Sequence, residues 1–397
     1  MSILSVNAGS SSLKFALHPL VEGGIAPAQV TGNIEGLEPG GQPRIVLREA
    51  GRASETLPIT AAAGEAFGAA LRDLRQLLRS RYAHVAVQAV AHRIVHGGSK
   101  HVQSVIVTPE VMNDLTALNA LAPLHQPHNL ACVRAFAESF EGVPQVACFD
   151  TAFHATLSPL ETTFAIDHTL TESGVRRYGF HGLSYQYVSQ ALKRVSPRSV
   201  GRLVMAHLGN GASVCATLAH QSCATSMGFS ALDGLMMGTR SGALDPGVLL
   251  YLMALGWDQA RIETLLYKQS GLLGVSGLSA DMRTLRADPS LAARFATDMF
   301  AHRVVREIGA QTATIGGLDV LAFTGGIGQH DPVLRQHVGQ ALRYLGLVLD
   351  DNRNLQAKGD VLVPIHADDS AIEVWVVPTD EEHVAASEAW HLLQNVR

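Results

Sequence analysis

Residues 3–17 read ILSVNAGSSSLKFAL, which is an apolar run, a small polar turn and a second apolar run. Apolar segments on both sides of such a turn predict a β-hairpin. At its tip, Gly9 lets a ligand approach the backbone closely, Ser10 to Ser12 offer hydroxyls, and Lys14 adds a cation. We therefore expect a phosphate-binding hairpin, with an ordinary surface hairpin as the alternative. It is not a P-loop, because the chain has no G-x-x-x-x-G-K-[ST] motif.

The same pattern recurs at residues 203–218, LVMAHLGNGASVCATL, where a Gly-Asn-Gly-Ala-Ser turn separates two apolar runs. A third glycine-rich turn, residues 324–328, follows the apolar run 320–323. Two similar hairpins predict an internally duplicated fold that closes on one nucleotide, with chance recurrence as the alternative. Glycine-rich turns at strand ends favour nucleotide phosphates as the ligand, and an α/β fold with its site at the strand ends.

The chain has 397 residues, of which 47% are hydrophobic and 16% charged, and its formal net charge is −5. This length and composition favour two domains with large cores. No block of like charges indicates a nucleic-acid or membrane surface, and the apolar run 248–255 is too short to cross a bilayer. Since neither a signal peptide nor a C-x-x-C motif is visible, we expect a cytoplasmic protein with free cysteine thiols.

Periodicity and end signals predict the other elements. Helices are expected at 61–81, after Thr108-Pro109, at 129–140, at 183–195, from Asp288-Pro289 to about 315, after Pro332 and at the C-terminus. Strands are expected at 85–95, 144–149, 320–323, 361–365 and 372–377. The glycine-rich residues 226–246 are expected to form a loop.

Polar and charged side chains lie at the predicted strand ends. Arg93 follows a buried strand, Asp150 ends another, and Arg240 lies in the glycine-rich loop. Arginine offers a planar fork that suits carboxylates and phosphates. Asn7 and Glu381, each just after a strand, offer the oxygen ligands that Mg²⁺ prefers. The alternatives are a solvated Arg240, a turn-capping Asp150 and a helix N-terminal carboxylate at Glu381.

The 18 histidines raise the question of a zinc site. The pair His92/His96 lies at a strand end, and Pro127 is expected to preclude a helical pair at His125/His128. Neither an H-E-x-x-H motif nor a Cys/His cluster is present, so zinc is not expected.

Taken together, these motifs resemble those of the acetate kinases over essentially the whole chain and in the family's order. The segments that carry the resemblance are residues 7–14 (NAGSSSLK), 92–98 (HRIVHGG), 149–154 (FDTAFH), 177–182 (RYGFHG), 207–211 (HLGNG), 236–242 (MMGTRSG) and 378–382 (PTDEE).

The resemblance implies a two-domain member of the acetate and sugar kinase/Hsp70/actin superfamily. Its fold would be α/β, with two duplicated ribonuclease H-like (actin-like ATPase) domains and the active site in the cleft between them. The expected domains are residues 1–150, completed by the C-terminal helix 386–397, and residues 151–385. The implied reaction is reversible Mg²⁺-dependent phosphoryl transfer from ATP to acetate, giving acetyl phosphate and ADP, with Mn²⁺ as a substitute metal. A homodimer is also implied.

Matched position by position, the resemblance assigns a role to each motif residue. Asn7 and Glu381 would serve the metal, Arg93 would hold the substrate carboxylate, and Asp150 corresponds to the family's essential acid. His181 and Arg240 would stabilise the transferring phosphoryl group. The nucleotide phosphates would be bound by Lys14, Ser10, Ser12, His207, Leu208, Gly209, Asn210 and Gly211. The adenosine would be held by Asp281, Met282, Arg283, Gly326, Ile327, Gly328, Gln329 and His330. The methyl pocket would be lined by Val95, Leu124 and Phe180.

A carboxylate substrate is already ionised near pH 7, so the implied reaction needs no base to create the nucleophile. The obstacle is to bring one anion against another. Arg93, Arg240 and His181, together with Mg²⁺, would offset that repulsion and align the attack. We therefore expect Asp150 to orient the substrate or the metal's water shell rather than to abstract a proton.

The chain departs from the family pattern in places. Gln329-His330 stands where the family has Glu-Asn after Gly-Ile-Gly, which leaves the base preference open. Gly-Leu-Ser-Tyr at 182–185 replaces Gly-Thr-Ser-His, and Gln-Pro-His at 126–128 replaces Asn-Pro-Pro. Neither of these two changes removes a residue with an assigned chemical role.

Two other functions remain as alternatives. A propionate kinase differs by one methylene in the pocket, which is worth only about 1–3 kcal/mol, and Val95 favours acetate over propionate. A non-catalytic, actin-like or chaperone-like ATP-binding switch belongs to another class. Such a switch would have no reason to carry both Arg93 and Arg240.

Overall fold

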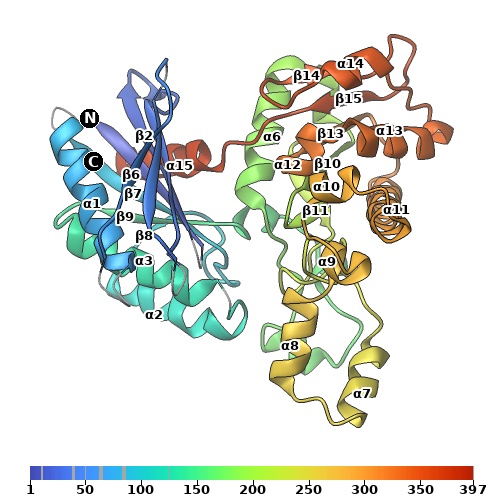
Figure 1. Cartoon of the computed structure of the whole chain (residues 1–397), viewed down its shortest axis with the longest axis horizontal. Helices are drawn as coiled ribbons and strands as arrows, with labels where there is room; N and C mark the ends of the chain where they lie inside the picture. Colours follow the sequence, from blue (N-terminus) through green and yellow to red (C-terminus); the bar gives the residue numbers. More distant parts are fainter. Residues whose placement is uncertain are drawn as a thin grey trace. The chain divides into compact units, whose positions relative to one another are not determined.

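The computed structural model describes residues 1–9, 12–37, 41–49, 51–61, 66–82, 86–123 and 125–396. The chain divides into two compact units (Figure 1). The first unit is Met1–Ala152 with Asp380–Arg397, and the second is Phe153–Thr379. The boundaries expected from the sequence lie after residue 150 and before residue 386, so the chain returns to the first unit earlier than that expectation.

The first unit is built on a sheet that starts with the predicted hairpin. Strands β1 (Ser2–Ala8) and β2 (Leu13–Val21) pair antiparallel, which confirms this prediction. The sheet order is β6-β5-β4-β2-β1-β7-β9-β8, and β3 pairs with β2. The other strands are β3 Gly24–Ile25, β4 Val30–Glu35, β5 Arg44–Glu49, β6 Glu55–Pro58, β7 Val87–Ile94, β8 Val105–Ile106 and β9 Gln145–Phe149. Strand β7 runs parallel to both β1 and β9.

The second unit repeats this arrangement. Strands β10 (Leu203–Leu208) and β11 (Ala212–Leu218) form the second predicted hairpin, which is also confirmed. The remaining strands are β12 Gln221–Thr225, β13 Val320–Thr324, β14 Val363–Pro364 and β15 Glu373–Val376. The order β12-β11-β10-β13-β15-β14 matches β4-β2-β1-β7-β9-β8, including the antiparallel edge strand. The predicted duplication is therefore confirmed at the level of sheet topology.

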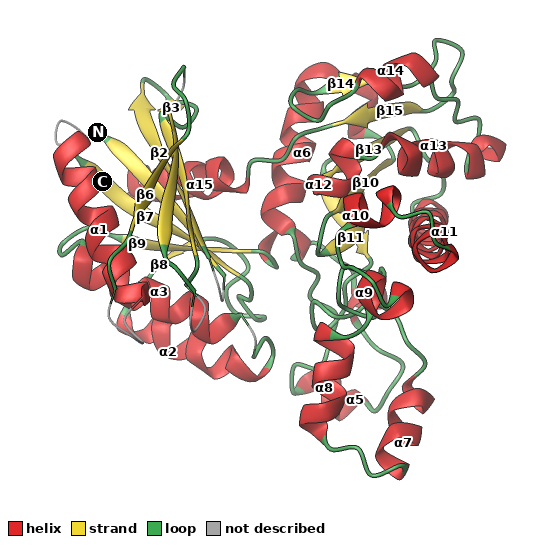
Figure 2. Ribbon diagram, in the orientation of Figure 1, coloured by secondary structure: helices red, strands yellow, loops and turns green. Residues whose placement is uncertain are grey.

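Helices accompany both sheets (Figure 2). Those of the first unit are α1 Ala66–Arg81, α2 Pro109–Ala117, α3 Gln126–Ser139 and α15 Glu381–Val396. Those of the second are α4 Pro159–Thr162, α5 His168–Glu172, α6 Gly182–Val195, α7 Pro246–Ala254, α8 Gln259–Lys268, α9 Gly271–Ser276, α10 Met282–Ala287, α11 Leu291–Thr314, α12 Gly325–His330, α13 Pro332–Ala341 and α14 Asp351–Gln356. Within the described residues, no helix has the length and apolar character that a membrane span requires.

Two local predictions were wrong. The long helix α11 is capped by Ser290, whose side chain accepts from Ala293 N, and not by Asp288. Asp288 instead accepts from the backbone of Ser290 and so shapes the turn before the helix. The glycine-rich residues after β13 form the short helix α12 and not an open turn. Gly325 makes this possible, because its φ is +75° and a Cβ there would lie 2.7 Å from Leu208 O.

The chain passes from one unit to the other after β9 and again after β15. After β9 the chain enters the second unit, where α6 packs Tyr185, Val188 and Leu192 against Leu203 and Met205 of β10. After β15 it returns to the first unit, where α15 packs on β1 and β7. This return brings the N-terminal residue of α15, Glu381, to the first unit's sheet.

Buried neutral histidines predict acid sensitivity. Burial lowers the pKa of His18, His92, His96 and His154 from 6.5 to about 4 in each case. The unfolded chain therefore binds more protons than the folded chain between those two values, so stability should fall as the pH drops through this window. Each histidine contributes a loss of about 1.4 kcal/mol per pH unit.

Urea unfolding followed from pH about 7 to about 5 checks this prediction. The His154→Gln variant, which removes one of these groups, should show a shallower dependence on pH than the unaltered protein. A midpoint that does not change over this range would contradict the prediction.

Candidate functional site

In the first unit, the candidate residues gather where neighbouring strands end. Strands β1, β7 and β9 lie side by side and run in the same direction, so their carboxyl ends meet at one edge of the sheet. Asn7 lies near the end of β1, Arg93 near the end of β7, and Asp150 directly after β9. Glu381 is added by the N-terminus of α15.

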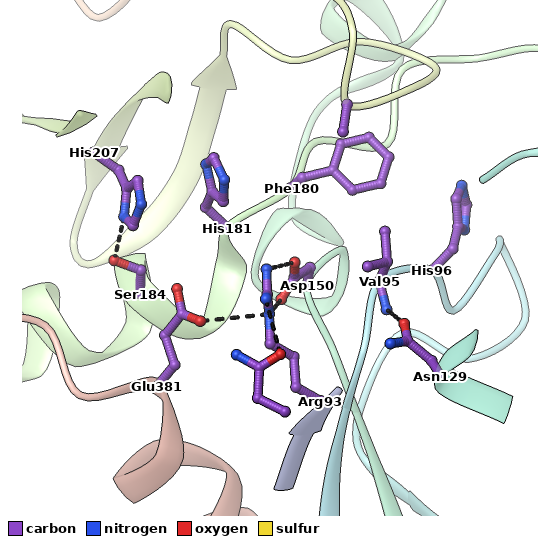
Figure 3. Close-up of polar contacts among 12 residues, drawn as sticks. Arg93, Val95, His96, Asn129, Asp150, Phe180, His181, Ser184, His207 and Glu381 are labelled. Carbon is purple, nitrogen blue, oxygen red and sulfur yellow. Dashed lines mark hydrogen bonds and ion pairs between the residues drawn. The ribbon is translucent and has the colours of Figure 1, made fainter. Parts of the chain in front are cut away.

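Arg93 connects these side chains (Figure 3). Its Nε and Nη2 donate to the two carboxylate oxygens of Asp150 at 2.9 and 2.6 Å, a bidentate ion pair. Its Nη1 donates to Asn7 Oδ1 at 3.2 Å, and its Nε lies 3.4 Å from Glu381 Oε2. One guanidinium, on β7, therefore holds oxygen atoms from the ends of two other strands and from one helix in a single cluster.

This cluster carries more negative than positive charge. Burial disfavours the charged form of Arg93, but the carboxylates of Asp150 and Glu381 outweigh it and raise the pKa of Arg93 above its ordinary value. Burial and the nearby carboxylate of Glu381 raise the pKa of Glu382. The Asp150 side chain is only 2% exposed. A recess here is lined by Ser5, Val6, Asn7, Arg93, Glu381, Glu382 and Ala385.

The donor set of this cluster fits a hard divalent cation such as Mg²⁺. The amide oxygen of Asn7 and the carboxylate of Glu381 both reach the same guanidinium, and oxygen ligands with several retained waters suit Mg²⁺. Glu381 occupies the first position of α15, so the alternative of a helix N-terminal carboxylate also describes it. No group of three or more His, Cys, Asp or Glu side chains that could hold a metal occurs in the described ranges.

The sequence did not predict two residues that stabilise the carboxyl edge of the first unit's sheet through hydrogen bonds. Asn129 accepts from Val95 N at 3.1 Å and donates to Ala8 O at 2.8 Å, so it ties the end of β7 to the end of β1. Gln126 accepts from His96 N at 3.2 Å and donates to His96 O at 3.0 Å. Both residues lie on α3, and both are buried.

The expectation that Pro127 rules out a helix at this position was wrong. Pro127 does not prevent a helix at His125 and His128, because proline fits the first turn and α3 begins at Gln126. His125 is the N-cap and His128 lies inside the helix. The predicted pocket residue Leu124 and the predicted phosphate ligand Ser10 lie outside the described residues. Val95 is buried, and Lys14 is exposed on β2.

In the second unit, the candidate residues surround the turn between β10 and β11. Gly209 N donates to Gly211 O at 3.0 Å, which closes the turn. A Cβ on Gly211 would lie 3.2 Å from His181 Nε2 and 3.9 Å from Arg240 Nη1. A Cβ on Gly209 would lie 3.8 Å from Gly326 N. The turn therefore has an imidazole, a guanidinium and the start of α12 around it, and its glycines keep the backbone uncovered.

Two stacked imidazoles stand beside this turn. The rings of His181 and His207 lie 4.3 Å apart and nearly parallel. His181 Nδ1 is 2.8 Å from Ser213 Oγ, and His207 Nδ1 is 2.8 Å from Ser184 Oγ (Figure 3 shows the second pair). His181 is also a left-handed residue, with φ 59°, at the N-cap of α6. Such backbone strain in a residue other than glycine is often found at functional sites.

The loop 226–245 carries Arg240 and contains no helix or strand, as expected. Arg240 Nη1 donates to Ala231 O at 3.0 Å. Gly238 N donates to Asn210 O at 3.0 Å, so the loop is fastened to the β10–β11 turn. A Cβ on Gly238 would lie 1.9 Å from Oδ1 of the exposed Asn210 and 3.3 Å from Ala280 O, so a larger residue would have to displace the Asn210 side chain.

The residues assigned to the adenosine lie on α10 and α12. Asp281 caps α10 and pairs with the exposed Arg283, while Met282 is buried. Gly326 to His330 belong to α12. Sequence reasoning missed Arg335, which is fully buried and donates to Gly328 O at 2.9 Å and Gln329 O at 2.7 Å. A guanidinium thus satisfies the last carbonyls of α12.

The structure therefore forms two groups, one in each unit. Asn7, Arg93, Asp150 and Glu381 cluster in the first unit, with Val95 nearby in the sequence. His181, His207, Gly209, Gly211, Arg240 and Gly326 cluster in the second. Phe180 is buried in the second unit. Ser184, Tyr185 and Ser213 were missed as partners of the histidines, although each lies inside a motif that the sequence had singled out.

Comparisons with known proteins agree along the whole chain. The sequence model of the Acetokinase family matches residues 2–387. A protein named acetate kinase from Rhodopseudomonas palustris is 45% identical over 408 residues, covering 100% of this chain and 99% of the relative.

Solved structures give the same picture. The propionate kinase from Francisella tularensis has a TM-score of 0.89 at 34% identity, covering 98% of each chain. The acetate kinase from Porphyromonas gingivalis has a TM-score of 0.87 at 36% identity, covering 99% of each chain. The expected two-domain fold class is therefore confirmed. With a family match over nearly its full length and close relatives in both comparisons, this chain belongs to the acetokinase family.

Proposed function

We propose that this protein is an acetate kinase, which transfers the terminal phosphoryl group of ATP to acetate and forms acetyl phosphate and ADP. The observation that carries the proposal is the bidentate pairing of Arg93 with a carboxylate at the carboxyl edge of the first unit's sheet. A relative with 45% identity is named acetate kinase, which supports acetate as the substrate. The match to the acetokinase family supports ATP as the phosphoryl donor and a divalent metal as the cofactor.

Arg93 would act on the acetate carboxylate. Its guanidinium can align two oxygens at once, and its surroundings keep it charged at every working pH. Acetate arrives ionised, so the cluster needs no general base. In this role Asp150 orients Arg93 and the substrate side of the site through its two hydrogen bonds, and it has no proton to abstract.

The second unit would hold the nucleotide. The glycines of the Gly209–Gly211 turn leave its backbone accessible, so phosphates can bind to it. His181 and Arg240 lie beside the same turn. Donors in these positions can stabilise the charge that spreads over the transferring phosphoryl group. Mg²⁺, when bound by oxygens such as those of Asn7 and Glu381, would neutralise phosphate charge. The expectation that both groups share one cleft stays a prediction from the sequence.

Propionate is the nearest alternative substrate, and the Francisella tularensis propionate kinase is a relevant neighbour. One methylene separates the two acids, so overlapping activity is expected, with acetate preferred because Val95 narrows the pocket. Adenine is the proposed base, although Gln329 and His330 depart from the family pattern. The homodimer and the cytoplasmic location also stay predictions from the sequence.

Trapping of the acyl phosphate tests the proposed function directly. The protein, ATP, Mg²⁺ and acetate should yield acetyl hydroxamate when hydroxylamine is present, and less product when propionate replaces acetate. Assays with other nucleoside triphosphates in place of ATP report the base preference. Hydrolysis of ATP without any hydroxamate, or nucleotide-dependent assembly into filaments, would favour a nucleotide switch instead.

Variants of the first cluster should separate binding from turnover. Arg93→Ala should raise the KM for acetate about ten- to hundredfold, because a charge-assisted bidentate contact is lost. Asp150→Asn should remove nearly all turnover with a modest change in the KM for acetate. Steady-state kinetics with each substrate varied in turn measures both effects.

Asp319→Asn is the matched control for these variants. Asp319 accepts from Arg202 Nε at 2.9 Å and Nη2 at 2.6 Å, which is the same bidentate geometry at the opposite end of β10 and β13. Its kinetics should be unchanged. A kcat close to that of the unaltered protein in Asp150→Asn would contradict the role given to Asp150.

A methyl group on the glycine turn should interfere with the nucleotide. Gly211→Ala would place a Cβ 3.2 Å from His181 Nε2. We expect kcat/KM for ATP to fall about ten- to hundredfold, because a small displacement of the phosphates misaligns the attack. The unfolding midpoint should stay the same.

Gly309→Ala on α11, where no atom lies within 4 Å, is the control and should leave the kinetics unchanged. An unaffected Gly211→Ala enzyme would exclude the turn as the phosphate site.

A further inference from the structure

The imidazole of His181 is hydrogen-bonded to a short series of buried hydroxyl groups. His181 Nδ1 lies 2.8 Å from Ser213 Oγ, and the same Oγ is hydrogen-bonded to the hydroxyl of Tyr185. Ser213 lies on β11 and Tyr185 on α6, and both side chains are fully buried. All three residues belong to the second unit, so this connection is internal to it.

The direction of these hydrogen bonds follows from the surroundings of Tyr185. Its phenol has one proton to donate, and the buried Oγ of Ser213 is the hydrogen-bond partner of that hydroxyl. Burial raises the pKa of Tyr185 well above its ordinary value, so the phenol keeps that proton. Ser213 then accepts from Tyr185 and donates its own proton to His181 Nδ1. A neutral imidazole that accepts at Nδ1 carries its proton on Nε2.

The Nε2 atom of His181 faces the glycine turn. It lies 3.2 Å from the position that a Cβ of Gly211 would occupy, and His207 Nε2 lies 3.9 Å from the corresponding position of Gly209. The Nε2 atoms of the two stacked rings therefore both lie near the turn. Ser184 lies at Nδ1 of His207, in the same way that Ser213 lies at Nδ1 of His181.

We propose that Tyr185 and Ser213 are positioning residues that hold His181 as its Nε2–H tautomer, aimed at the transferring phosphoryl group. The proposal rests on the proposed function and adds residues to it. It concerns this chain in particular, because Tyr185 stands where the acetate kinase pattern has histidine. A fixed donor needs no reorientation when negative charge develops on the phosphoryl oxygens.

The tautomer can be observed without any activity. Nitrogen-15 NMR of the unliganded protein, labelled at histidine, distinguishes Nε2–H, Nδ1–H and doubly protonated rings. The signals of His181 are those that disappear in His181→Gln. We expect the Nε2–H form at neutral pH, and a mixture of tautomers in Ser213→Ala. An Nδ1–H or charged ring in the unaltered protein would overturn the proposal.

Kinetics tests whether Tyr185 acts through Ser213. Ser213→Ala should lower kcat about ten- to hundredfold with little change in the KM for acetate or ATP, since the donor matters mainly in the transition state. Tyr185→Phe should lower kcat less, about three- to tenfold, because Ser213 remains. The double variant should be no slower than Ser213→Ala, since in the proposal the Tyr185 hydroxyl acts on His181 through Ser213.

Tyr178→Phe is the matched control, because it removes a largely buried hydroxyl that donates to Gly174 O at 2.8 Å. It should change kcat in neither background.

If Tyr185→Phe slows Ser213→Ala as much as it slows the unaltered enzyme, Tyr185 acts independently and the proposal fails. If the unaltered protein forms no acetyl hydroxamate, the proposed function fails, and the NMR result still decides the tautomer. If Ser213→Ala does not fold, the spectra of the unaltered protein and of Tyr185→Phe decide it.

Discussion

A charged guanidinium among carboxylates is the constraint on which the first unit depends. Arg93 is mostly buried, and its hydrogen bonds to Asp150 and Asn7 and its ion pair with Glu381 join residues far apart in the chain. Loss of any partner would leave a buried charge partly unsatisfied, which is costly. Parallel strands make this arrangement possible, because the ends of β1, β7 and β9 meet at one edge. The return of α15 to the first unit adds the remaining carboxylate.

The two copies of the fold carry different chemistry at equivalent places. The first unit has Arg93 near the end of β7, whereas the equivalent strand of the second unit, β13, runs into Gly325 and Gly326. The first copy thus presents charge, which suits a small anionic substrate. The second presents backbone N–H groups, imidazoles and the guanidinium of Arg240, which suits a polyphosphate. With the proposed roles, a common topology with divided tasks would let one duplicated chain bind two anions that repel each other.

Much of the fold follows from local patterns, and the remainder depends on distant contacts. Both hairpins and the Thr108 cap of α2 could be predicted, because apolar runs, turn residues and capping residues act over a few positions. The cap of α11 was missed, because Asp288 and Ser290 are both good caps and only the structure shows which one serves. Ser213 and Arg335 were missed as site residues, because their partners lie in other elements and no local pattern reveals such pairs.

The most direct test of the central claim is a crystal structure of the protein with acetate and ADP. The account predicts that the acetate carboxylate accepts hydrogen bonds from the guanidinium of Arg93, and that the ADP phosphates lie against the Gly209–Gly211 turn. Acetate bound away from Arg93, with that guanidinium still engaged only by its own carboxylates, would contradict it.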